Sequence, residues 1–127
     1  MTRTRTTPSV TWAAPCVVLT LTGEVDIALT HPLARAVDDA LLLLDAHRDP
    51  RTTVVVDLTA VSFLDSTGLH HLMRLRREAA ERPRPVLVHL IISPDQDGIR
   101  RLFSITALDT VFPIHATPAE AMAAPAT

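Results

Sequence analysis

The run Thr53-Val54-Val55-Val56-Asp57-Leu58 constrains the fold more strongly than any other segment of this sequence. Its side chains are apolar on both faces of an extended strand, which suits the centre of a sheet covered by helices on both sides. A helical spacing of apolar residues follows from Ser66 to Ala79 and stops before Pro83 and Pro85. A buried strand that leads into an amphipathic helix predicts an α/β domain.

Strand and helix patterns alternate along the rest of the chain. We expect further strands at Ser9–Trp12, Cys16–Thr22, Val86–Ile92 and Val111–His115, and helices at Thr30–Ala46, Asp95–Phe103 and Pro118–Ala123. The first two strands are predicted to form a hairpin, and Thr30 is predicted to cap the first helix. Because right-handed crossovers return each helix over a face of the sheet, this order predicts a mixed sheet of four to five strands with helices packed on it.

The length and composition suit one domain. A chain of 127 residues that is 47% hydrophobic can bury one core, though not two. We expect a flexible segment over residues 1–8, the domain over 9–123 and a tail over 124–127. The apolar run Val10–Leu21 alternates like a half-buried strand, so we expect neither a secretion signal nor membrane insertion. The single cysteine, Cys16, fits the cytoplasmic location that this implies.

Charge and glycine content disfavour several kinds of ligand. The formal net charge is -2, whereas binding to a nucleic-acid backbone needs a large surplus of basic residues. A basic run is made by Arg74, Arg76, Arg77, Arg82 and Arg84, and such a run is typical of the solvated face of a helix. The three glycines are scattered, so the chain lacks a glycine-rich phosphate loop. We therefore expect no direct contact with nucleic acid and no cofactor.

A polar cluster stands where the buried strand gives way to the helix, and Ser66 lies within it. If Ser66 is the N-cap, its hydroxyl accepts a hydrogen bond from an unpaired N–H group of the first turn, which is a structural role. The same position suits a phosphate, because free N–H groups and the helix dipole favour an anion there. A phosphate beside Asp65 would repel an acidic or apolar partner surface without unfolding the domain.

The sequence supports two other interpretations of this region, a catalytic site and a metal site, less well than it supports a phosphate site. Ser66 could act as a nucleophile with His70 as its base, since residues four apart share a helical face, but no third group of a triad is identifiable. His70 and His71 point about 100° apart on a helix, so they cannot face one metal ion together. We expect both histidines at the surface or at its boundary, no bound metal and no enzymatic activity.

The residues from Val56 to Leu69 resemble the signature of the STAS-domain anti-sigma-factor antagonists. In that family a valine-rich strand and an aromatic residue lead into Asp-Ser-Ser-Gly-Leu, and Thr67 here replaces the second Ser. Leu21–Asp26 resembles the family's Gly-Glu-Leu-Asp turn, and two blocks, Ile99–Phe103 and Leu108–Phe112, resemble its C-terminal segment. The resemblance covers roughly residues 9 to 123 and implies a single STAS-like domain.

The resemblance also implies a function and a set of site residues. The unphosphorylated protein is expected to bind an anti-sigma-factor serine kinase, which frees its sigma factor. The kinase then phosphorylates the antagonist at Ser66, which switches binding off, and a serine phosphatase reverses the step. By the same resemblance Asp26, Asp65, Thr67 and Gly68 are the expected partner-binding residues, with Thr67 an alternative site of modification. A weak homodimer is a further expectation.

One alternative keeps the fold and changes the function. A STAS domain could serve without a switch as a subunit of a lipid-transport complex or as part of a signalling scaffold. The sequence does not separate this alternative from the antagonist.

Overall fold

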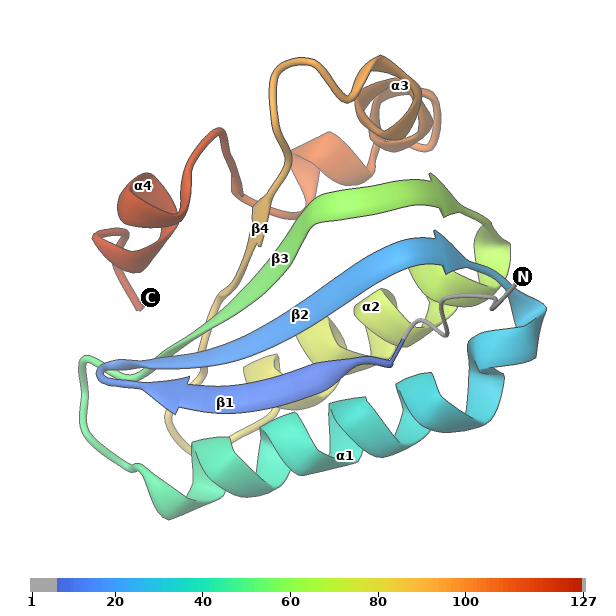
Figure 1. Cartoon of the computed structure of the whole chain (residues 1–127). Coiled ribbons are helices and arrows are strands. Elements are labelled where there is room, and N and C mark those ends of the chain that lie inside the picture. Colours follow the sequence, from blue (N-terminus) through green and yellow to red (C-terminus); the bar gives the residue numbers. More distant parts are fainter. Residues whose placement is uncertain (1–6, 127) are drawn as a thin grey trace.

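Five strands form one mixed sheet with helices on both of its faces (Figure 1). The computed structural model describes residues 7–126, so most of the expected flexible segment and residue 127 of the expected tail lie outside the described residues. The strands, in their spatial order, are β1 (Ser9–Ala13), β2 (Cys16–Val25), β3 (Thr53–Leu64), β4 (Val88–Ile91) and β5 (Ile114–His115). β1 runs antiparallel to β2, and the other neighbouring pairs are parallel. This confirms the predicted α/β domain with a mixed sheet.

Helices cover the sheet in two groups. They are α1 (Thr30–Ala46), α2 (Ser66–Ala80), α3 (Asp97–Ile105) and α4 (Pro118–Met122), with short 3-10 turns η1 (Ile27–Leu29) and η2 (Leu108–Thr110). α1 and α2 lie on one face, and α3 and α4 lie on the other (Figure 1). Val54 and Val56 join the main core with α1 and α2, whereas Val55 packs with Ala121 of α4. The valine-rich run is therefore central and buried on both faces, as predicted.

Some boundaries differ from the predicted ones, and pairing explains the largest difference. β3 continues past Leu58 to Leu64 because β2 stays paired with it as far as Val25 and Leu64, across two register shifts. The last strand keeps only Ile114–His115 of the predicted Val111–His115. The turn η2 precedes it, entered through Ala107 in the left-handed conformation at φ 59°. A 3-10 turn cannot continue a sheet ladder, so this strand starts late.

The predicted helix cap at Thr30 is wrong. Leu29 stands at the N-cap position of α1 and offers no side-chain hydrogen bond, and Thr30 is already helical. The capping side chain acts earlier, on η1: Asp26 Oδ1 accepts a hydrogen bond from the N–H of Ala28 at 2.9 Å. Because η1 leads directly into α1, the carboxylate of Asp26 orders the entry to both helical segments.

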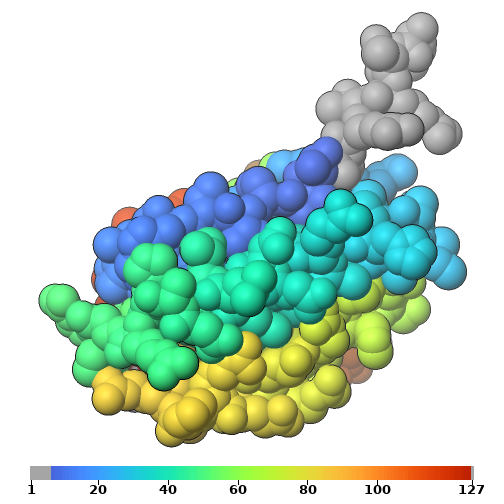
Figure 2. Space-filling model, turned by 90° about the horizontal axis from the view of Figure 1, so that it is seen from below, coloured from blue at the N-terminus to red at the C-terminus, as the bar shows by residue number. Residues whose placement is uncertain are grey.

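The basic run, which spans α2 and the segment after it, is only partly a solvated face, which corrects the expectation. Arg74 donates to Asp38 of α1 at 3.0 Å and to Glu78 at 2.7 Å. Arg82 donates to both carboxylate oxygens of Asp45 at 2.9 and 3.1 Å. Arg74 ties α2 to α1, and Arg82 ties the segment after α2 to the end of α1. The two helices lie side by side across the face seen in Figure 2. Helical spacing alone did not indicate that the acidic side of α1 faces them.

The segment after α4 is held against β4. The carbonyl of Ala126 accepts a hydrogen bond from the N–H of Leu87 at 2.9 Å. The carbonyl of Pro125 accepts from His89 Nε2 at 2.8 Å, so His89 Nδ1 is left to accept from His115 Nε2 at 3.0 Å. Burial lowers the pKa of His89, which favours this neutral arrangement. The C-terminal segment thus extends the hydrogen bonding of the sheet.

Candidate functional site

The loops that follow β2 and β3 lie side by side, because both strands are parallel and end at the same edge of the sheet (Figure 1). Asp26 follows β2 and Asp65 follows β3. The N–H of Asp65 donates to the carbonyl of Val25 at 3.2 Å, which joins the start of the second loop to the end of β2. Two of the predicted site residues, from distant parts of the sequence, are thereby brought together beside the first turn of α2.

Asp65, not Ser66, caps α2, which corrects the conditional prediction for Ser66. The carboxylate Oδ1 of Asp65 accepts hydrogen bonds from the N–H groups of Thr67 at 2.9 Å and Gly68 at 3.3 Å. A carboxylate placed one residue before the helix reaches the unpaired N–H groups, and its charge suits the positive end of the helix dipole. Ser66 becomes the first helical residue, and its side chain is exposed.

The hydroxyl of Ser66 is therefore free of a structural task. Among residues 7–126, no side-chain hydrogen bond involves it. Its backbone is nonetheless fixed, because the bonds of Asp65 hold the residues on either side. The neighbouring Thr67 is only half-buried, and its side chain follows around the same turn. Ser66 thus presents an accessible hydroxyl from a fixed position at a helix N-terminus.

Gly68 is buried and acts through packing. A Cβ atom at this position would collide with Cδ1 of Leu64 and would stand 3.0 Å from Cγ1 of Val25. Glycine lets the first turn of α2 approach the ends of β2 and β3 this closely without displacing the side chains of Leu64 and Val25. Of the expected partner-binding residues, Gly68 therefore sets the position of the loop, whereas Asp26, Asp65 and Thr67 lie at least partly at the surface.

Two exposed apolar side chains flank the loops, and sequence reasoning missed both. Ile27, which follows Asp26 directly, is 76% exposed, and Phe63, two residues before Asp65, is 49% exposed. Exposed large apolar residues beside a polar site are typical of protein–protein contact surfaces. Phe63 could have been found from the sequence, because it is a large aromatic residue two positions before Asp65, where the strand gives way to the polar cluster. No local pattern indicates that Ile27 lies outside the core.

The residues of the hydrolase reading do not form a nucleophile–base contact. No hydrogen bond between described residues joins Ser66 to His70. His71 is buried, contrary to the expectation, and burial, with a smaller contribution from His70 and Arg74, lowers its pKa. Within residues 7–126 no group of three metal-ligating side chains is close enough to hold an ion.

Replacing the capping carboxylate should destabilise the fold measurably. Asp65→Ala removes both hydrogen bonds to the first turn of α2, so we expect the free energy of unfolding to fall by about 1 kcal/mol. Asp65→Asn keeps an accepting oxygen and should keep most of this stability. Urea denaturation of the three proteins measures the difference. An equal loss in both variants would show that charge, and not the hydrogen bonds, stabilises the turn.

The comparisons with known proteins agree with this architecture. The family model for the STAS domain matches residues 3–121. An anti-sigma factor antagonist from Mycobacterium paratuberculosis superposes with a TM-score of 0.73 at 25% identity, over 93% of this chain and 92% of that one. An anti-sigma-factor antagonist (STAS) domain protein from Planctomyces limnophilus superposes with a TM-score of 0.69 at 21% identity, over 94% of this chain and 97% of that one. No curated protein sequence matches this chain significantly.

A further solved structure has the same fold. The anti-sigma factor antagonist SpoIIAA in its unphosphorylated form superposes with a TM-score of 0.60 at 18% identity, over 89% of this chain and 91% of that one.

Over residues 7–126, none of the helices combines the length and hydrophobicity that crossing a bilayer requires.

Proposed function

This chain belongs to the STAS domain family, and on that premise we propose that it is an anti-sigma-factor antagonist switched by phosphorylation of Ser66. In the unphosphorylated form it binds an anti-sigma-factor serine kinase, which releases the sigma factor. Phosphorylation at Ser66 ends this binding, and a serine phosphatase restores it. The protein itself acts in the cytoplasm as a binding module, and the kinase and the phosphatase supply the catalysis.

One observation carries the proposal: the Ser66 hydroxyl is exposed at the first position of α2 and is free of side-chain hydrogen bonds to described residues. A kinase can reach such a hydroxyl without unfolding the loop. The helix cap does not depend on it, because Asp65 makes the capping bonds. Modification therefore changes the charge of the surface while the fold beneath it stays in place.

Electrostatics explains how a phosphate would switch binding. The modification adds about -1.5 to -2 charges at neutral pH. The helix N-terminus favours this charge within the free domain. Towards a partner the effect reverses, because the phosphate would stand beside Asp65 and near Asp26 and add to their negative charge. A partner surface that packs on the loop would have to remove water from all three groups, which is costly without matching cations.

The exposed apolar side chains give the unphosphorylated surface a means of binding. Ile27 and Phe63 flank the loop that carries Ser66 and can be buried against a partner. Asp26 and Asp65 supply polar contacts at the rim. The proposed contact surface therefore consists of the loops after β2 and β3 and the first turn of α2. Thr67 belongs to the same surface as a second, less exposed hydroxyl.

Phosphorylation in vitro tests the proposal. The purified protein is incubated with ATP and with each anti-sigma-factor serine kinase encoded in the same genome, and the modified residue is mapped by mass spectrometry. We expect one phosphate on Ser66 and none in Ser66→Ala. Phosphate that persists in Ser66→Ala and disappears in Thr67→Ala would move the switch to Thr67. Absence of phosphate with every kinase, together with co-purification with membrane transporter subunits, would favour a subunit without a switch.

A further inference from the structure

The end of β3 has a strand neighbour on one side only. Pairing with β4 stops at Asp57 and Ile91, whereas β3 continues beside β2 as far as Leu64. Within residues 7–126 no strand lies on the other side of this end. Backbone carbonyl groups that point to that side therefore lack the partner that a sheet ladder supplies, and they need another donor.

The side chain of Gln96 supplies that donor. Its Nε2 donates to the carbonyls of Leu58 and Val61, each at 2.9 Å. Its Oε1 accepts a hydrogen bond from the N–H of Ser93 at 2.7 Å. Only one orientation of the amide fits these partners, because the two carbonyls need N–H groups and the N–H of Ser93 needs an oxygen. One side chain, placed directly before α3, therefore joins the loop after β4 to β3.

The two carbonyls that Gln96 binds stand on either side of a bulge in β3. Counted against β2, β3 holds one extra residue between Asp57 and Ala60. In a regular strand, residues three apart send their carbonyls to opposite sides, whereas Leu58 and Val61 send theirs to the same amide. The hydrogen bonds of Gln96 therefore fix the backbone at both ends of the bulge.

The bulge determines which side chains of the following residues face the core. Beyond it, Leu64 is 5% exposed and Phe63 is 49% exposed, and a slip by one residue would exchange the faces of these two side chains. Leu64 lies against Gly68 in the first turn of α2, and the N–H of the next residue, Asp65, donates to the carbonyl of Val25. The position of the loop after β3 therefore depends on the register that the bulge sets.

From this geometry we propose that Gln96 is a positioning residue for the proposed contact surface around Ser66. Its amide takes the place of a strand beside the end of β3 and holds the register that exposes Phe63 and buries Leu64. The same register places Ser66 at the first position of α2. The effect of Gln96 on partner binding rests on the proposed function, whereas its effect on the geometry of the loop does not.

Hydrogen exchange of the full chain, followed by NMR, tests the positioning role without a partner. The N–H of Asp65 reports on the loop, because it is bonded to the carbonyl of Val25, and the N–H of Leu41 in α1 reports on general destabilisation. We expect Gln96→Ala to accelerate exchange at Asp65 about tenfold or more relative to exchange at Leu41. Gln96→Glu has nearly the same size and should act likewise, because its carboxylate has no N–H to donate to the two carbonyls.

Thr106→Ala is the matched control on the same helix. It removes the hydroxyl that donates to the carbonyls of Leu102 and Phe103 at the other end of α3. This change leaves the amide of Gln96 in place, so the ratio of the two exchange rates should stay as it is in the unsubstituted protein.

Phosphorylation kinetics link this geometry to binding. With the kinase that modifies the unsubstituted protein, Gln96→Ala should raise KM about tenfold and change kcat by less than about threefold, because the hydroxyl of Ser66 remains while the surface that docks is displaced. Thr106→Ala should change neither constant. An unchanged KM in Gln96→Ala would overturn the role of Gln96 in binding.

The exchange rates decide the structural part of the proposal. Equal acceleration at Asp65 and Leu41 in Gln96→Ala, an unchanged ratio in Gln96→Glu, or the same rise in Thr106→Ala would each overturn it. If no kinase modifies the unsubstituted protein, the antagonist function fails, and the exchange rates still decide whether Gln96 positions the loop.

Discussion

Ser66→Asp is expected to lower the affinity for the anti-sigma-factor kinase by about 100-fold or more, while the domain stays folded. The substitution puts a permanent negative charge where the phosphate is proposed to form. It stands beside Asp65, whose N–H is bonded to the carbonyl of Val25, the residue before Asp26, so the partner would meet three acidic groups together. A like-charge contact or a desolvated charge at an interface costs several kcal/mol, and 100-fold corresponds to about 2.7 kcal/mol.

The stability of the same variant should not fall. Ser66 is the first residue of α2, and an acidic side chain in the first turn of a helix is favoured by about 0.3–1 kcal/mol. Its hydroxyl makes no hydrogen bond to a described residue that the substitution would remove. Urea denaturation should therefore give a free energy of unfolding equal to or slightly above that of the unmodified protein.

Two controls separate the site from the charge. Ser104→Asp adds the same charge at another exposed serine, on α3, and should bind the kinase as tightly as the unmodified protein. Ser66→Ala removes the hydroxyl without adding charge and should bind with nearly unchanged affinity. Calorimetry with the purified kinase measures all four proteins. Unchanged affinity in Ser66→Asp, or an equal loss in Ser104→Asp, would refute a switch located at Ser66.

The arrangement of the sheet edge could be predicted from the sequence because it depends on few contacts. The run Thr53–Leu58 is apolar on both faces, and a strand of this kind has few places in an α/β domain other than the centre. Once β2 and β3 are parallel neighbours, their carboxyl ends must meet at one edge. Asp26 and Asp65 follow those ends, so their proximity follows from topology alone.

The cap of α2 and the ion pairs between the helices could not be predicted, because several side chains could have made each contact. Ser66 and Asp65 are both good capping residues, and which one caps depends on where the helix starts, a matter of one residue. The carboxylate of Asp65 reaches two N–H groups in this register, so it takes the role. Pairing of Arg74 and Arg82 with α1 depends on how two helices pack, and helical spacing says nothing about the neighbouring helix.

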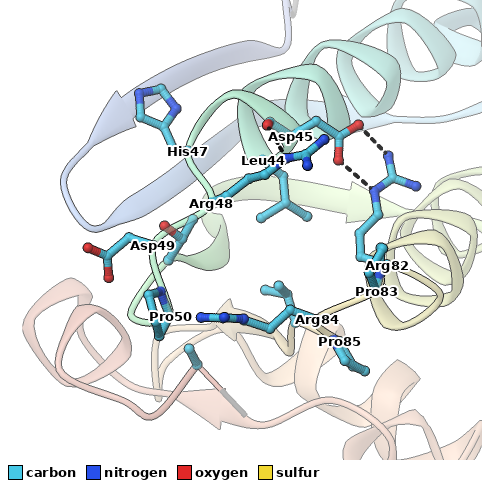
Figure 3. A pocket seen from close by; sticks show the side chains of 13 residues that line it. Leu44, Asp45, His47, Arg48, Asp49, Pro50, Arg82, Pro83, Arg84 and Pro85 are labelled. Atoms are coloured by element: carbon cyan, nitrogen blue, oxygen red, sulfur yellow. Dashed lines mark hydrogen bonds and ion pairs between the residues drawn. The ribbon is translucent and has the colours of Figure 1, made fainter.

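The cavity between the end of α1, the segment after α2 and the C-terminal segment (Figure 3) could not be predicted either, because it depends on how these segments pack. Its lining comes from segments that are separated in the chain, from Leu44 to Ala126, and no local motif joins them. In the sequence, Arg84 and Arg48 cannot be distinguished from the arginines that form ion pairs. Only the packed structure shows which guanidinium groups are engaged and which face a cavity.

Gly68→Ala is expected to destabilise the protein by about 1–2 kcal/mol, although alanine favours helices. In an unhindered helix the change from glycine to alanine gains up to about 1 kcal/mol. At Gly68 the new methyl group collides with Leu64 and stands 3.0 Å from Cγ1 of Val25. Leu64 is 5% exposed and Val25 is fully buried, so neither side chain can turn towards solvent. Overpacking of this kind costs about 1–3 kcal/mol and outweighs the helix preference.

Gly98→Ala supplies the matched control with the opposite sign. Gly98 lies near the start of α3, and a Cβ there would meet nothing within 4 Å, so the free energy of unfolding should rise by up to about 1 kcal/mol. Urea denaturation of both variants decides between helix preference and packing, since helix preference alone predicts that both gain stability. A gain in Gly68→Ala would show that α2 does not need glycine to approach β2 and β3. A loss in Gly68→Ala with a gain in Gly98→Ala would show that glycine at this loop is required by the close packing that positions Ser66.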